Sequence, residues 1–264
     1  MKKVKLLIVT IFLFNGFFAC APTYESVRVH IPQQTKKNQA QVEATLPELD
    51  GNSFGTQIDG SYTITDNIVI SAGGIFHTYD DHARGADGAS TDETFMGVHA
   101  GAGYLHKYND WLRFTSLLGM SAQSWTYNTT PNNDELFDDV GFDRFDATVL
   151  SPFGQAGLIL GKEDTNITFL VRVETPMFNF SNTKPKERTV VEFDDEGNTS
   201  ERLVTYNLDE SLVLLIPTIQ ANLGVSDHFS LFAQTLTNRT FGLDENSGID
   251  VRIFGLYLGG VAKF

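Results

Sequence analysis

Cysteine is almost absent from this 264-residue chain, which contains only Cys20. A single cysteine excludes an internal disulfide framework and a cysteine-based zinc site, because each needs at least two. Positive charge is also scarce, since 19 Lys and Arg stand against 33 Asp and Glu, for a formal net charge of −14. Nucleic-acid phosphates require a basic surface, so we do not expect this chain to bind DNA or RNA.

The one marked apolar run lies at the N-terminus. Three lysines within the first five residues precede the run Leu6–Phe14, and this order is typical of a secretory signal. The run is too short to span a membrane as a helix. Ala19 supplies a small residue directly before Cys20, as at a lipoprotein cleavage site. We therefore predict a signal peptide over 1–19 and a lipidated Cys20, whose acyl chains would hold the protein at a membrane. An ordinary signal with an incidental cysteine is the alternative.

Helical periodicity is missing from the mature chain. Residues 20–37 show no clean period, and we interpret them as a lipidated tether. From residue 38 to 264 apolar and polar residues alternate with a period of two, which indicates half-buried β-strands. The alternation predicts ten strands, at 39–47, 55–65, 67–78, 94–106, 111–125, 147–161, 166–180, 211–225, 228–240 and 250–264.

The predicted connections alternate in length. Four are short polar turns rich in Asp and Asn, which suit tight hairpins, and the others are long. An extra hairpin is expected in the longest connection, where 188–193 and 202–206 flank an Asp-Asp-Glu-Gly turn. Short turns at one end, long loops at the other and an even strand count predict an all-β, transmembrane, antiparallel up-and-down β-barrel. The alternatives are eight strands, if the first pair is misassigned, and a soluble β-sandwich or ligand-binding barrel.

Four segments resemble a known group of proteins: Cys20–Tyr24, the Lys-Lys-x-Gln stretch at 36–39, Gly60–Asn67 and Ala72–Phe76. They are similar to Bacteroidota outer-membrane β-barrel lipoproteins of uncharacterised function, over roughly residues 20–78 and the last strand. The resemblance implies a short linker between an acylated cysteine and a barrel, and it implies no activity. Surface-exposed lipoproteins of that phylum carry an acidic cluster after the cysteine. Ala21–Tyr24 is uncharged, which favours an anchor and an N-terminus on the periplasmic side, where an even strand count also puts both chain ends.

Charged residues also occur on the predicted lumen face. The lumen of a barrel with eight to ten strands is just wide enough for side chains to fill it, and buried charges must pair. We therefore expect a neutralised internal network, with a selective pore as the alternative. The predicted network consists of Glu43, Asp59, Arg113, Arg172, Glu174 and Arg252.

An enzyme is a further alternative. His77, Asp80, Asp81 and His82 lie where the third predicted strand meets a long loop, and Asp/His sets can activate water for hydrolysis of surface peptides or lipid. No nucleophile elbow or phosphate loop is present.

The acidic loop at 134–146 does not have the spacing of a Ca²⁺ loop, so no metal and no cofactor is predicted. We expect a non-catalytic lipoprotein barrel of the cell outer membrane with a structural or envelope-accessory role. Its expected partners are outer-membrane lipids and, through acidic outer loops, other envelope proteins or lipopolysaccharide.

Overall fold

A computed structural model describes most of the chain. The described residues are 23–24, 28–34, 36–46, 53–80, 90–130, 142–163, 165–185, 188–193, 199–204, 212–241, 250–251 and 254–264. None of these residues is helical, and the described part contains no helix of the length and apolarity that crossing a membrane requires.

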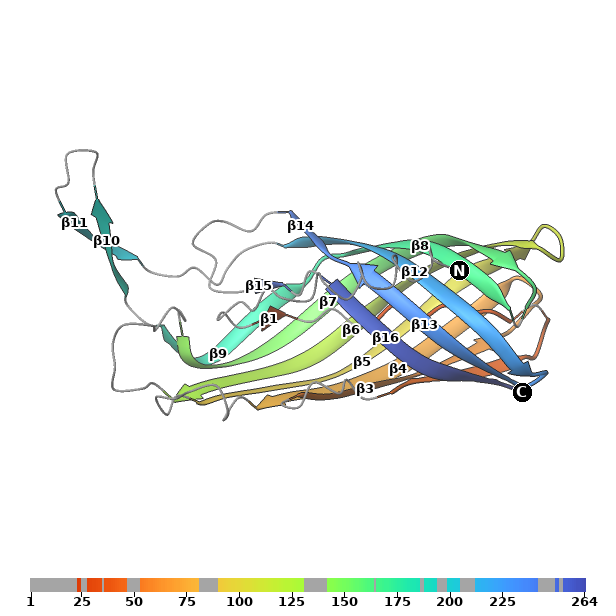
Figure 1. The fold of residues 1–264 in the computed structure, drawn as a ribbon, viewed down its shortest axis with the longest axis horizontal. Coiled ribbons are helices and arrows are strands. Elements are labelled where there is room, and N and C mark those ends of the chain that lie inside the picture. The colour runs from red at the N-terminus through yellow and green to blue at the C-terminus, as the bar shows by residue number, and fades with distance from the viewer. Residues whose placement is uncertain are drawn as a thin grey trace, which may run out of the picture.

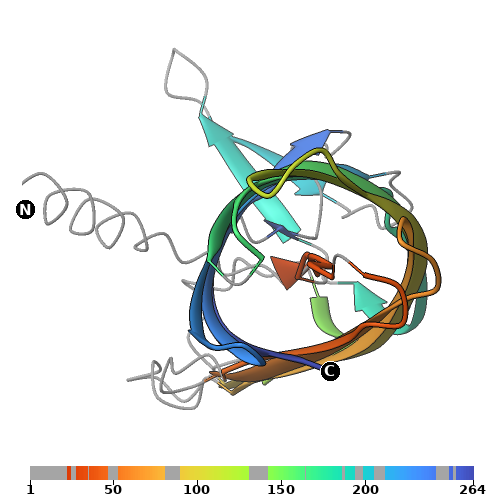
Figure 2. The ribbon, with the colours of Figure 1, turned by 90° about the vertical axis from the view of Figure 1, so that its right-hand side faces the viewer.

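A closed antiparallel β-barrel accounts for nearly all of the described residues (Figures 1 and 2). Each strand pairs with the next along the chain. The last strand, β16, pairs with both β13 and β2, which joins the two ends of the sheet. Eight of the strands are β2 (Ala40–Thr45), β3 (Ser53–Thr63), β4 (Ile68–Asp80), β5 (Ser90–Lys107), β6 (Leu112–Thr130), β7 (Phe142–Gly161), β12 (Val213–Ser226) and β16 (Phe254–Lys263).

The other two barrel strands are each interrupted once. β8 (Asn166–Glu174) pairs with the C-terminal half of β7. After Thr175 and Pro176, β9 (Met177–Pro185) continues along the N-terminal half of β7. Proline has no N–H to donate to a neighbouring strand, which accounts for a break at this point. β13 (Phe229–Thr237) likewise continues as β14 (Arg239–Phe241) after Asn238. The barrel therefore has ten strands, as predicted, and the eight-strand alternative is wrong.

The two ends of the barrel differ in their connections. The short turns cover 64–67, 108–111, 162–165 and 227–228, and the C-terminal Phe264 lies at this short-turn end, on the right in Figure 1. The long connections leave the opposite, long-loop end. One of them contains the predicted extra hairpin, β10 (Arg188–Phe193) paired with β11 (Thr199–Val204). The alternation of connection lengths is confirmed.

An apolar band surrounds the short-turn part of the barrel. On β6, outward-facing positions from Leu112 to Ala122 are mostly apolar, and ten residue steps on a strand tilted by about 40° rise about 25 Å. That height matches the apolar belt of a transmembrane barrel, so the fold is of the outer-membrane type. Exposed side chains of the band include Ile58, Ile70, Val98, Leu118, Met120, Leu158, Phe169, Val171, Ile219, Leu231 and Leu258.

Above this band the polarity of the wall is reversed. On β6, Ser124 and Thr126 are exposed on the outside, whereas Trp125 and Tyr127 are buried inside. The same reversal occurs on the neighbouring strands: Arg144 and Thr148 face out from β7, where Phe145 faces in. The long-loop part of the barrel thus has an apolar interior and a polar exterior, like a water-soluble protein.

Candidate functional site

The lumen of the barrel is occupied by the protein's own N-terminal segment. Residues 28–34 are buried, and Figure 2, which views the barrel from the short-turn end, shows the start of the described chain inside the ring of strands. The expected tether over 20–37 is therefore inside the barrel at residues 28–34, and it is exposed at Lys36 and Lys37. The extended segment is held inside the barrel because the inner wall forms charge pairs and hydrogen bonds with it.

The segment runs along the barrel axis in one direction. Asn38 hydrogen-bonds Thr63 at the short-turn end, and Gln34 donates to Ser61 further in. At the other extreme, β1 (Thr23–Tyr24) pairs in parallel with β15 (Asp250–Val251), which belongs to the last long connection. The first described residues therefore lie toward the long-loop end, opposite to the side on which we expected the N-terminus.

Arg28 is the centre of a buried charge cluster. Its guanidinium donates to Glu43 Oε1 at 2.6 Å and to Asp59 Oδ2 at 2.7 Å, and these three side chains are at most 1% exposed. His30 Nδ1 lies 3.0 Å from Glu43 Oε2, and His99 Nε2 lies 3.0 Å from Asp59 Oδ1. Glu43 and Asp59 are directly paired across β2 and β3, so two like charges face the lumen side by side. Arg28 supplies the cation that this arrangement requires.

Glutamine side chains of the wall satisfy the backbone of the segment. Gln57 accepts from the Arg28 N–H at 2.9 Å and donates to the Arg28 carbonyl at 3.1 Å. Gln41 accepts from the Gln33 N–H and donates to the carbonyl of Ile31. The wall strands are already paired with one another, so only side chains are left to bind this extended backbone. Three further donors reach carbonyls of the segment: Gln234 to Val29, Gln155 to His30, and Arg113 to Gln33.

A second ion pair lies further along the lumen. Arg172 Nη2 and Glu174 Oε2 are 2.9 Å apart, and the guanidinium lies over the ring of Phe153, 3.8 Å from its centroid. Tyr24 donates to Glu174 Oε1 at 3.1 Å, and its hydroxyl lies 3.3 Å from Ser151 Oγ. The start of the described chain is therefore tied to this pair.

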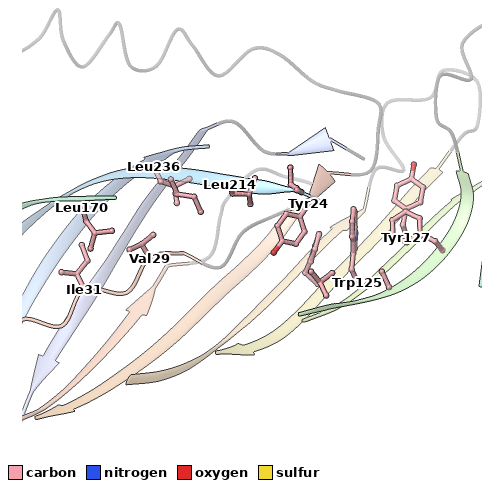
Figure 3. Packing of buried hydrophobic residues seen from close by; sticks show 14 of the residues in the cluster. Tyr24, Val29, Ile31, Trp125, Tyr127, Leu170, Leu214 and Leu236 are labelled. Atoms are coloured by element: carbon pink, nitrogen blue, oxygen red, sulfur yellow. The ribbon is translucent and has the colours of Figure 1, made fainter. Parts of the chain in front are cut away.

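An aromatic cluster fills the lumen beyond the second ion pair. The Tyr24 ring lies within 6.3 Å of the rings of Phe95, Trp125 and Phe178. The rings of Phe95 and Trp125 stack with 5.0 Å between their centroids, and Phe145 meets Trp125 edge-on. Figure 3 shows Tyr24 beside Trp125, with Val29 and Ile31 further down the barrel near Leu170 and Leu236. The N-terminal segment thus contributes to both the polar and the apolar interior.

Of the six predicted network residues, five face the lumen. Glu43, Asp59, Arg113, Arg172 and Glu174 are all buried, whereas Arg252 lies outside the described residues. Their pairing differs from the expectation that wall acids and wall arginines neutralise one another. Arg172 and Glu174 pair in this way, whereas Glu43 and Asp59 bind Arg28 of the N-terminal segment.

Sequence reasoning missed Tyr24, Arg28 and His30, which all lie in the predicted tether. A signal was present, because Glu43 and Asp59 were both expected to face the lumen, where buried charges must pair. In the structure they are neighbours across β2 and β3, and Arg28 supplies a cation between them. Arg28 and His30 alternate with Val29 and Ile31 in a segment that lies outside the ten predicted strands.

The proposed rim residues are not assembled into a site among the described residues. His77 is 5% exposed and faces the interior, where an added Cβ on Gly55 would lie 2.5 Å from its ring. Asp80 ends β4 opposite Asp92 of β5. Asp81, His82 and the lipidation candidate Cys20 lie outside the described residues, as does most of the acidic loop at 134–146. No cluster of three or more potential metal-ligating side chains occurs in the described part of the chain.

Comparison with known proteins gives likeness of fold only. No protein-family model and no curated protein matches the sequence. Among solved structures, the outer membrane protease OmpT from Escherichia coli aligns with 11% identity and a TM-score of 0.43, covering 87% of this chain and 94% of that one. The translocator domain of the autotransporter NalP from Neisseria meningitidis aligns with 12% identity and a TM-score of 0.42, covering 86% of each chain. Likeness at this level carries no argument about activity.

Proposed function

We propose that the protein is a non-conducting, non-catalytic barrel of the outer membrane that serves as a structural or accessory element of the envelope. The observation that carries this proposal is the filled lumen. In a water-filled pore, inward-facing polar side chains are exposed to solvent. Here the inward-facing residues Gln57, Thr115, Gln123, Gln155 and Gln220 are each at most 5% exposed. Buried side chains of this kind do not line a water-filled path.

The part of the barrel above the apolar band supports the accessory role. Its exterior is polar and its interior is aromatic, so this part of the wall extends beyond the apolar band on the side of the long connections. In transmembrane barrels the long loops face the cell exterior and the short turns face the periplasm. The proposed partners are lipids around the apolar band and, at the acidic outer loops, other envelope proteins or cation-bridged lipopolysaccharide. Lipidation of Cys20 remains part of this proposal.

Conductance in planar bilayers tests the closed lumen. We expect no single-channel steps from the wild-type protein. Arg28→Glu places a third acid beside Glu43 and Asp59 and should displace the segment, so we expect channel openings from this variant. Lys107→Glu reverses a charge at an exposed turn and should stay silent. Steady openings from the wild type would overturn the proposal.

The accessory role has a separate test. The protein is extracted from its own membranes in mild detergent, and the mass of the particle is measured. We expect a particle larger than one barrel, since an accessory element is retained with its partners. A monodisperse preparation containing one barrel and no other protein would contradict the role while leaving the closed lumen intact.

A further inference from the structure

The described N-terminal segment runs through the lumen of the barrel. It leaves β2 at the short-turn end, passes along the lumen as residues 34 to 28, and reaches β15 of the last long connection at Tyr24. This route is held by Arg28 in the buried charge cluster and, at its far end, by Tyr24 at Glu174. The N-terminal segment therefore passes through the lumen that its own barrel strands enclose.

The height of Tyr24 can be read from its neighbours. Its ring contacts Trp125 of β6, and the outward-facing residues on either side of Trp125 are the exposed Ser124 and Thr126. On the same strand the apolar band ends at Ala122. Tyr24 therefore lies at the level where the outer surface changes from apolar to polar, which is the membrane boundary at the long-loop end.

We propose that the N-terminal end of the mature chain emerges at the long-loop end of the barrel, on the cell surface. Four residue steps lead from Tyr24 to Cys20, a reach of at most about 14 Å, so an N-terminal acyl group would lie on the long-loop side of this boundary. The assignment of this end to the cell surface rests on the proposed function. It reverses the periplasmic placement expected from the even strand count, because that count considers only the wall strands and not a segment inside them.

Disulfide trapping tests the route in the full-length protein. Thr23 and Asp250 are paired backbone positions, at the spacing between adjacent strands, which lies within the Cα range of a disulfide. We expect Thr23→Cys/Asp250→Cys to form a cross-link that shifts the mobility of the unfolded chain on a non-reducing gel. The matched pair Thr23→Cys/Ser226→Cys joins the same residue to a turn at the opposite end and should not cross-link. A cross-link in this second pair and none in the first would overturn the route.

Surface exposure is tested on intact cells. An epitope inserted between Ala21 and Pro22 should bind antibody without permeabilisation, whereas the same epitope between Asp227 and His228, in a short turn, should bind only after it. Binding at both sites only after permeabilisation, with the first cysteine pair still cross-linked, would contradict surface display and keep the route. Conductance by the wild type with the same cross-link would instead contradict the closed lumen alone. If the insertion prevents folding, the cysteine pairs still decide the route.

Discussion

The two halves of the lumen hold the same N-terminal segment by different means. Near the short-turn end most inward-facing side chains are polar, and Arg28 is bound by two buried carboxylates while glutamines bind the backbone. Near the long-loop end the interior is aromatic, and Tyr24 packs among the rings of Phe95, Trp125 and Phe178. The change coincides with the end of the apolar band outside. Where a strand passes from lipid to water, its outward-facing residues change from apolar to polar and its inward-facing residues change from polar to apolar. The strand itself continues, and successive residues still alternate between the two faces.

Arg28→Met should have the largest effect on this comparison. It leaves Glu43 and Asp59 as two buried like charges, and breaking a buried pair in this way costs about 3–5 kcal/mol. We expect that loss in the free energy of unfolding, measured as the urea midpoint of the folded band on unheated gels. The triple variant Arg28→Met/Glu43→Gln/Asp59→Asn should recover most of it. Wild-type stability in the single variant would show that the charge cluster does not hold the polar half.

Leu118→Arg sharpens the boundary between the two halves. Leu118 faces outward near the middle of the apolar band, where an arginine in a barrel wall costs about 2–4 kcal/mol. Thr126→Arg places the same charge on the same strand above the band, and it should cost less than about 0.5 kcal/mol. Folding into lipid vesicles of defined composition measures both. Equal costs would mean that lipid reaches Thr126 and that the proposed boundary is misplaced.

Tyr24→Phe should have the smallest of these effects. It keeps the ring in the aromatic cluster and removes the hydroxyl that donates to Glu174, for an expected loss of about 1–2 kcal/mol. Tyr62→Phe is the matched control, because that hydroxyl contacts Asn38 at an exposed site and should matter little. Urea midpoints of the two variants measure the difference. If they agree, Tyr24 is held by its ring alone.

The predicted strands fall short of the observed ones where the pattern is reversed. The strand expected over 111–125 extends to Thr130, and that expected over 147–161 begins at Phe142. Each extension lies above the apolar band, where Tyr127 and Phe145 face inward and polar residues face outward. A strand prediction that follows the apolar residues on one face stops where they change to the other face. The change of environment from lipid to water is then mistaken for the end of the strand.

The sequence by itself determined the wall of this barrel. Alternation with a period of two, short Asp/Asn turns and the length of each repeat specify strand number, pairing order and the inward face, because each depends on neighbours close along the chain. Only the tertiary structure decided what occupies the lumen. Arg28 meets Glu43 and Asp59, and Tyr24 meets Glu174 across 150 residues, and such contacts exist only once the wall has closed. Local sequence patterns indicate which residues are shielded from water. The partner of a buried charge depends instead on which groups the closed barrel brings together in its lumen.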